Sequence, residues 1–173
     1  MRLFIAVPLP KEIQTRVFNF ERQLMERCEE GRFVPQGNFH ITLHFFGETN
    51  ELAPICNAMR ETVKDARPFL LNLADYGYFA HGGARTSFLK VGGNLSELFR
   101  IHSILESALW ERGFAKGRGR LQPHITLARA VKHGDLSGLE APNDGFWVKS
   151  IVLFESRREK DRQVYLPVHT ESF

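Results

Sequence analysis

Apolar residues recur along the chain with two different periods, and each period predicts one kind of element. Residues 2–7 (RLFIAV) form a short apolar run closed by two prolines, which is typical of a strand. Over residues 11–28 the apolar positions are spaced by four, three and four, which predicts an amphipathic helix. A second helix is predicted over residues 52–65, where apolar residues lie four positions apart and a proline is tolerated in the first turn.

The second part of the chain continues in the same way. Two strands are predicted around a glycine-containing loop, and a third helix begins at Asn94 or Ser96, either of which can cap it, and runs to about Trp110. The remaining segments are a basic loop, a strand, a long loop and two further strands: residues 115–120, 123–129, 133–145, 147–154 and 163–170. The order of elements is strand, helix, strand, helix, two strands, helix and three strands.

Each half of this order contains a helix followed by a strand that carries the letters HITL. We therefore predict an α+β fold that is bilobal, with two pseudo-duplicated antiparallel sheets facing a central cleft and helices on the outside. The 173 residues contain no low-complexity segment or linker, so we expect one domain, residues 1–173, made of two pseudo-symmetric lobes.

The two HITL strands carry the candidate chemistry. Strand side chains alternate between faces, so His40 and Thr42 share one face, and His124 and Thr126 share one face of the other strand. The isoleucine and leucine of each copy can be buried, whereas the polar face must meet water or a ligand. If the polar faces meet, two imidazoles and two hydroxyls lie in one cleft.

These residue types suit attack at phosphorus. Histidine has an ordinary pKa of about 6.5, so one ring can accept a proton while the other donates one near neutral pH. Threonine hydroxyls donate hydrogen bonds to anionic phosphate oxygens. One HITL strand alone would be weak support, because most such histidines are core or surface residues. Two copies favour catalysis, although the residues alone do not order the acid and the base.

Other chemistries lack the residues that they need. No nucleophilic serine or cysteine is accompanied by a base and an orienting acid. On an extended strand His40 and His44 would lie about 13 Å apart, too far to share one ion. The sequence contains no HExxH or CxxC motif. We therefore predict neither a metal ion nor a cofactor.

Composition refines this picture only slightly. The chain is 43% hydrophobic and 25% charged, which is ordinary for a globular protein, and no apolar run is long enough to span a membrane. The net charge of +3 permits a polyanionic partner without requiring one. Two cysteines do not form a disulfide framework, so we expect a reduced, cytoplasmic setting. We also expect a monomer that is not associated with a membrane.

Four segments extend the pattern beyond the HITL copies: MRLFIAVPLP, RFVPQGNFHITLHFFGE, RLQPHITLAR and VLFESR. In this order they resemble the 2H phosphoesterase superfamily, and within it the RNA 2′,3′-cyclic phosphodiesterases, also called 2′-5′ RNA ligases. The resemblance implies a catalytic cleft between two lobes and metal-free opening of a 2′,3′-cyclic phosphate to a 2′-phosphomonoester. It also implies a related reaction that joins RNA ends through a 2′-5′ linkage.

The resemblance assigns roles to four residues. It makes His40 the proton donor to the leaving 3′-oxygen and His124 the proton acceptor that activates water, while Thr42 and Thr126 hold the nonbridging oxygens. The implied substrates are RNA with 2′,3′-cyclic phosphate ends, tRNA fragments among them, or small cyclic nucleotides.

Five further residues are candidates for substrate binding. Arg129 resembles a phosphate-contacting arginine of the family, but strict alternation places it opposite His124 unless the strand twists, bulges or ends. Arg85 lies where the family often has an arginine. Phe46 has the parity of His40 and could stack on a base, and Lys116 and Arg118 lie in a basic loop that would attract RNA.

For each of these five residues an ordinary structural interpretation stays open, as strand-end, core or solvated loop residues. The parity of His40 also includes His44, for which a position on the rim is the favoured interpretation. The alternative function for the whole chain is a non-catalytic nucleotide- or RNA-binding module, which intact copies of both motifs disfavour.

Overall fold

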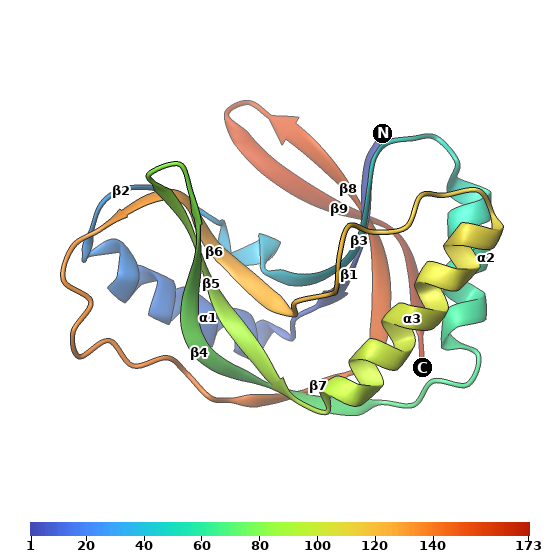
Figure 1. The fold of residues 1–173 in the computed structure, drawn as a ribbon, viewed down its shortest axis with the longest axis horizontal. Coiled ribbons are helices and arrows are strands. Elements are labelled where there is room, and N and C mark those ends of the chain that lie inside the picture. The colour runs from blue at the N-terminus through green and yellow to red at the C-terminus, as the bar shows by residue number, and fades with distance from the viewer.

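The protein is described over residues 1–173 by a computed structural model that contains three α-helices and nine strands (Figure 1). The helices are α1 (Lys11–Met25), α2 (Leu52–Val63) and α3 (Leu95–Glu111). The strands are β1 (Arg2–Pro8), β2 (Cys28–Phe33), β3 (His40–Glu48), β4 (Phe69–His81), β5 (Ala84–Gly93), β6 (His124–His133), β7 (Gly145–Val148), β8 (Ser150–Glu159) and β9 (Arg162–Ser172). The predicted α+β class is confirmed.

The strands form one curled antiparallel sheet in the order β7-β4-β5-β6-β3-β1-β8-β9, with β2 paired to β6. Two lobes of this sheet, β1-β3-β8-β9 and β2-β4-β5-β6-β7, correspond to the two sheets that the sequence predicted. They are joined where β3 meets β6, at the single pair Ile41 and Ile125. The two HITL strands are therefore neighbours at the centre of the molecule, each belonging to a different lobe.

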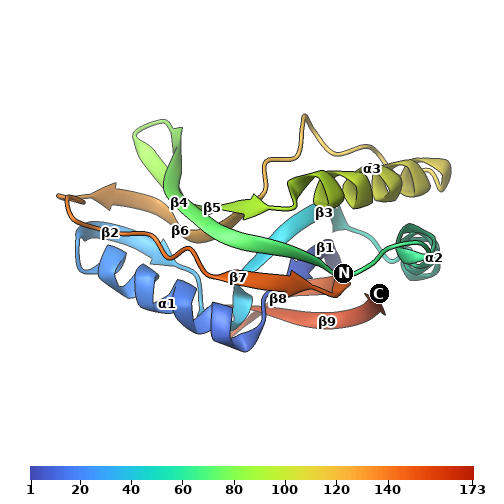
Figure 2. The same cartoon turned by 90° about the horizontal axis from the view of Figure 1, so that it is seen from below.

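The helices are exchanged between the lobes. The helix α1 precedes β3 in the sequence but packs under the lobe of β6, where Phe20 contacts Tyr76 of β4. The helix α3 precedes β6 but packs on the lobe of β3, where Glu106 accepts a hydrogen bond from His44. Figures 1 and 2 show α1 along one lobe and α2 with α3 along the other. Neither half of the sequence folds into a lobe by itself.

Two parts of the strand prediction were wrong. The strand β2 was missed, and the first helix ends at Met25 because the chain turns into this strand. Its sequence, CEEGRF, is rich in charge, and the strand lies at the edge of the sheet. Charged side chains on an edge strand disfavour pairing of its free backbone groups with another chain. The predicted strand over residues 147–154 is two strands, because the chain leaves β4 after Val148 and β8, which begins at Ser150, pairs with β9 and with β1 instead.

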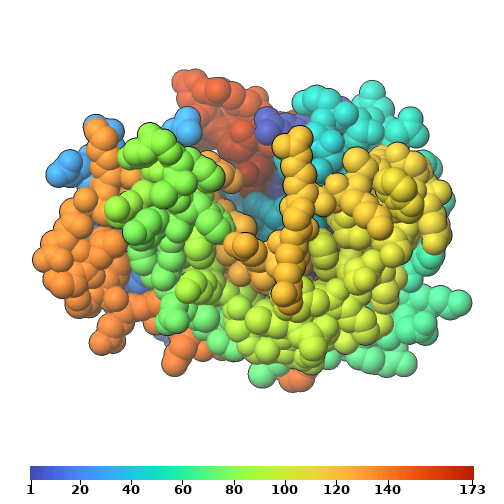
Figure 3. Space-filling view, in the orientation of Figure 1, coloured from blue at the N-terminus to red at the C-terminus, as the bar shows by residue number.

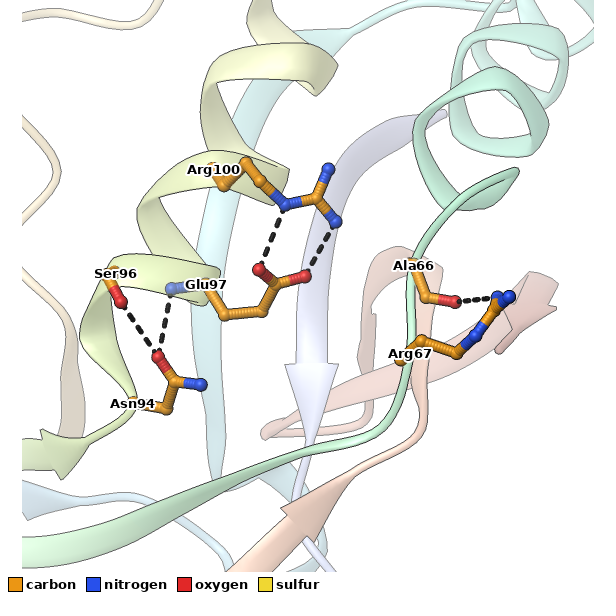
Figure 4. A network of polar contacts seen from close by, with 6 residues as sticks. All are labelled: Ala66, Arg67, Asn94, Ser96, Glu97 and Arg100. Carbon is orange, nitrogen blue, oxygen red and sulfur yellow. Dashed lines mark hydrogen bonds and ion pairs between the residues drawn. The ribbon is translucent and has the colours of Figure 1, made fainter.

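The start of α3 agrees with one of the two predicted caps. The side chain of Asn94 accepts hydrogen bonds from the backbone N–H of Glu97 and from the hydroxyl of Ser96 (Figure 4). One turn further along the helix, Arg100 donates two hydrogen bonds to the carboxylate of Glu97. None of the three α-helices combines the length and the apolar character that a membrane span requires.

Candidate active site

The histidine and the threonine of each HITL motif line one cleft of about 610 Å³ between the lobes. Ile41 and Ile125 pair in antiparallel register, so their neighbours His40, Thr42, His124 and Thr126 project together from the opposite face. In this register each histidine lies beside the threonine of the other motif. Figure 3 shows the hollow, bounded by the β8–β9 hairpin, the β4–β5 hairpin and the segment that leads into β6.

Both imidazoles are held in the same manner. The Nδ1 atom of His40 lies 2.7 Å from the carbonyl oxygen of Asn38, and Nδ1 of His124 lies 2.6 Å from the carbonyl oxygen of Gln122. A carbonyl oxygen only accepts, so Nδ1 carries the hydrogen in both rings. Proton transfer within the cleft therefore falls to Nε2 of each ring.

His40 is the more enclosed of the two. Its Nε2 atom accepts a hydrogen bond from the Thr42 hydroxyl at 2.9 Å, and its ring packs against Phe4 and the edge of Tyr165 at centroid distances of 4.9 and 5.3 Å. Burial lowers the pKa of His40 to about 4, and the nearby His124 and Arg129 act in the same direction against the bond to the Asn38 carbonyl. His40 is therefore neutral at pH 7 in the free protein.

His124 lies in a more open setting. Phe79 and Phe88 meet its ring edge-on, at centroid distances of 5.4 and 5.3 Å. Its hydrogen bond to Gln122 is exposed, whereas the bond that His40 makes to Asn38 is partly buried. Each catalytic candidate thus has two aromatic neighbours and is half-buried, and the hydrogen bond that anchors His40 is the less exposed of the two.

A bulge follows each motif and reverses the faces of the strand. On β3 the register with β1 skips Leu43, and on β6 the register with β5 skips Leu127. As a result two consecutive side chains are buried in each strand. Arg129 therefore returns to the cleft and lines it, which meets the condition that strict alternation had set for this residue.

The equivalent of Arg129 on β3 is Phe45, which the sequence analysis missed. Phe45 lines the cleft and is 51% exposed, with the guanidinium of Arg2 over its ring at 5.2 Å. Its neighbour His44 is only 5% exposed and is bound to Glu106, so the expected rim position for His44 was wrong. An alternating pattern gave no sign of the bulge that exchanges these two residues.

Three other candidates lie along a second groove of about 710 Å³. This groove shares Thr42, Phe45 and His124 with the cleft and continues along the basic loop. Phe46 lines it beside Phe114, and Lys116 and Arg118 form part of its wall. The loop is attached to α3 because the backbone N–H of Gly117 donates to Glu106 at 2.8 Å.

Arg85 is placed differently from the prediction. It lines neither the cleft nor the second groove. Its guanidinium donates to Nδ1 of His133 at 3.0 Å and lies 4.2 Å from the centroid of the Tyr78 ring. The geometry gives no support to substrate binding by Arg85. Elsewhere, no group of three or more His, Cys, Asp or Glu side chains is arranged to hold a metal ion.

Paired His-x-Thr strands at a cleft between two lobes define the class of site, and comparison with known proteins defines the family. Residues 12–158 match the model of the 2′-5′ RNA ligase superfamily. The chain belongs to this superfamily.

Individual relatives agree with this assignment. An RNA 2′,3′-cyclic phosphodiesterase of Geobacillus stearothermophilus is 33% identical over 168 residues, which cover 91% of this chain but 52% of that protein. This chain thus spans about half the length of that relative. An Escherichia coli protein of the same name is 27% identical over 168 residues, covering 96% of this chain and 93% of its own.

Solved structures share the fold along the whole chain. The protein TT0787 of Thermus thermophilus superposes with a TM-score of 0.83 at 24% identity and covers 99% of this chain and 97% of its own. The apo form of LigT from E. coli gives a TM-score of 0.77 at 25% identity, with coverage of 99% and 96%.

Proposed function

We propose that this protein hydrolyses RNA 2′,3′-cyclic phosphate ends to 2′-phosphomonoesters by general acid–base catalysis without a metal ion. One observation carries the proposal: the histidine and threonine of both HITL motifs line one cleft, and Nδ1 of each histidine is anchored to a carbonyl, so proton transfer falls to Nε2. The names of the relatives support the choice of substrate.

In the proposed reaction water attacks phosphorus from the side opposite the 3′-oxygen. Nε2 of His124 accepts the proton of the attacking water, the bond between phosphorus and the 3′-oxygen breaks, and Nε2–H of His40 donates a proton to that oxygen. The hydroxyls of Thr42 and Thr126 stabilise the charge on the nonbridging oxygens. Arg129 lines the cleft further along the strand of His124.

The donor role of His40 requires the substrate to change its protonation. In the free protein the pKa of His40 is about 4, so the ring carries no donor proton on Nε2 at pH 7. A phosphate anion bound between the histidines favours the imidazolium and therefore raises this pKa. The bound substrate would in this way recruit the proton that its own leaving group needs.

Product analysis tests the proposal. The protein is incubated with cytidine 2′,3′-cyclic phosphate or a short RNA with a cyclic end, and 2′-phosphate is scored against 3′-phosphate. We expect 2′-phosphate as the product, at a rate that a chelator does not change. A 3′-phosphate product would contradict the leaving group, and binding without turnover would support the alternative of a binding module.

A second reaction, 2′-5′ joining of RNA ends, is favoured by the groove that adjoins His124. This groove gives a second strand a place beside the proposed proton acceptor, along a wall that includes Lys116 and Arg118. A 5′-hydroxyl of that strand would replace water as the attacking group. Incubation of cleaved tRNA halves with cyclic ends tests this reaction, and joined product sensitive to removal of His124 is expected.

We further propose that residues 1–173 work as a single 2H phosphoesterase domain, as a monomer in the cytoplasm, with tRNA fragments among the substrates. The monomer is checked by the mass of the protein in solution. The location is checked by fractionation of cells. Recovery of tRNA fragments with cyclic ends from cells that lack the protein checks the substrate.

A further inference from the structure

The ladder between β2 and β6 contains two cross-strand pairs of charged residues. One pair joins opposite charges and the other joins like charges. Glu30 lies opposite Lys132, and their side chains form an ion pair at 3.2 Å. Arg32 lies opposite Arg129 further along the same ladder. Directly opposed side chains have Cβ atoms about 4.5–5.5 Å apart, and like charges at that separation destabilise a sheet. An anion bound between the two arginines would therefore relieve their mutual repulsion.

No group of the chain supplies that anion. Neither Arg32 nor Arg129 forms an ion pair, although other arginines find carboxylates, as Arg158 does with Asp161 and Arg157 with Glu155. Both arginines line the cleft that contains the histidines, and Arg2, Arg158 and Asp161 line it as well. Arg32 and Arg129 therefore present two guanidinium groups to the same solvent-filled space.

The two arginines lie at different distances from the reacting centre. Arg129 shares a strand with His124, and both line the cleft together with His40. Arg32 lies one strand further out, on the edge strand β2. The pair thus extends from the histidines toward the rim of the cleft, beyond the position of the reacting phosphate.

We propose that Arg32 and Arg129 form a second phosphate subsite that takes the internucleotide phosphate on the 5′ side of the terminal nucleoside. This inference rests on the proposed function, because it places the cyclic phosphate between the histidines. Guanidinium groups present planar pairs of donors that match phosphate oxygens. An RNA end carries this second phosphate one nucleoside away, whereas a nucleoside 2′,3′-cyclic phosphate lacks it. The subsite would therefore select RNA ends over mononucleotides.

The minimal test compares cytidine 2′,3′-cyclic phosphate with the same compound carrying a 5′-phosphate. We expect the wild-type protein to prefer the 5′-phosphorylated compound by about tenfold in kcat/KM, since a charge-assisted pair contributes about 1.4 kcal/mol or more. The variant Arg32→Gln should lose this preference and keep its activity on the compound without the 5′-phosphate. Arg32→Lys should retain part of the preference, because lysine keeps the positive charge but lacks the planar pair of guanidinium donors.

Lys132→Gln is the matched control. It removes a cation from the same ladder, but one already paired with Glu30, so the preference should survive. Equal loss of preference in Lys132→Gln and Arg32→Gln would overturn the subsite, because general attraction would then explain it. Equal loss of activity on both compounds in Arg32→Gln would also overturn it, since the arginine would then act on the reacting phosphate or the fold.

Equilibrium binding separates the subsite from the proposed reaction. Adenosine 3′,5′-bisphosphate and adenosine 3′-phosphate are titrated into the wild-type protein and Arg32→Gln by calorimetry. We expect the bisphosphate to bind about tenfold more tightly to the wild type only, with a gap that narrows as salt is added. If neither cyclic compound is hydrolysed but this gap is present, the reaction fails and the subsite stands. Equal binding of both nucleotides would overturn the subsite.

Discussion

His40 and His124 occupy equivalent positions on β3 and β6, yet one is enclosed and the other faces an open groove. Both rings are anchored through Nδ1 to the carbonyl two residues earlier, and both motifs end in a bulge. Both rings are half-buried and line the cleft, but only His124 also lines the second groove. Duplication therefore accounts for the geometry, and the surroundings distinguish the two rings.

The residues after the bulges differ in the same way. At the position that returns to the cleft, β3 carries Phe45 and β6 carries Arg129. At the position that becomes buried, β3 carries His44 and β6 carries Ala128. One lobe thus offers an aromatic ring and the other a cation at equivalent points. A pair of identical motifs becomes an asymmetric site through the two residues that follow each of them.

The largest effect is expected from removing either histidine. His40→Ala and His124→Ala should each lower kcat for cyclic-phosphate hydrolysis by about 1,000-fold, because each removes a proton-transfer group. Circular dichroism should show both variants folded. Robust turnover by either variant would break the equivalence of the two rings and the proposed scheme with it.

The leaving group sharpens the comparison, because only the proton donor becomes dispensable with a good leaving group. A nucleoside 2′-(p-nitrophenyl phosphate) releases p-nitrophenolate, which needs no proton at pH 7. If His40 is the donor, His40→Ala should recover most of its activity on this ester and His124→Ala should not. The reverse result would make His124 the donor and His40 the acceptor. The low pKa of free His40 would agree with that assignment, because a neutral ring can accept a proton.

A change of pH should act on the enclosed ring. As the proposed donor, His40 must be protonated, so its contribution to kcat/KM should fall along a limb as pH rises above about 4, the pKa of free His40. Bound phosphate raises that pKa, so the corresponding limb of kcat should lie at higher pH. Rates at each pH measured beside the protein's circular dichroism would check this. A common limb near pH 6.5 for both parameters would show that burial does not control His40.

A smaller effect is expected at Glu106, which links His44 on β3 to the basic loop through Gly117. Glu106→Gln removes the negative charge of the carboxylate that accepts both hydrogen bonds. The bond to Gly117 should therefore weaken, and the loop should be held less firmly. We expect KM for an RNA substrate to rise about three- to tenfold with little change in kcat. The control is Glu111→Gln, an exposed acid on the same helix. A fall in kcat alone would contradict a role in positioning the loop.

The sequence was sufficient for the parts of the site that depend on side-chain alternation. His40, Thr42, His124 and Thr126 repeat a polar face, so their convergence followed from two identical strands. The bulges did not follow, because Leu43 and Leu127 continue an ordinary alternating pattern and the extra residue is revealed only by pairing with β1 and β5. For that reason Phe45 was overlooked and Arg129 was left open.

The fold shows the same division. Helices and apolar strands were predicted because burial imposes a period on them. The edge strand β2 was not, since CEEGRF buries almost nothing and its position depends on pairing with β6. The break after Val148 could not be predicted either, because it reflects a change of partner from β4 to β1 within one apolar segment. Arg85 was misplaced because nothing nearby in the sequence identifies His133 as its partner.

The smallest effect on activity, and the clearest on stability, is expected at Glu21, the buried acid of α1. Glu106 on the other exchanged helix finds partners, whereas Glu21 is 1% exposed and its Oε1 atom has no hydrogen-bond partner. Burial raises the pKa of Glu21 to about 8. The folded protein then binds a proton that the unfolded chain releases above about pH 4.5, so this group lowers stability progressively as pH rises from about 4.5 to 8.

Replacing that acid with its neutral isostere tests the contrast between the helices. Glu21→Gln should raise the free energy of unfolding by roughly 1–3 kcal/mol at pH 8 and leave it almost unchanged at pH 4. Urea unfolding at both pH values measures this, with the exposed Glu29→Gln as the control. Hydrolysis should be unaffected, because Glu21 lines neither groove. An equal change at both pH values would mean that Glu21 is ionised in the folded protein, as Glu106 is, and the two helices would then be alike.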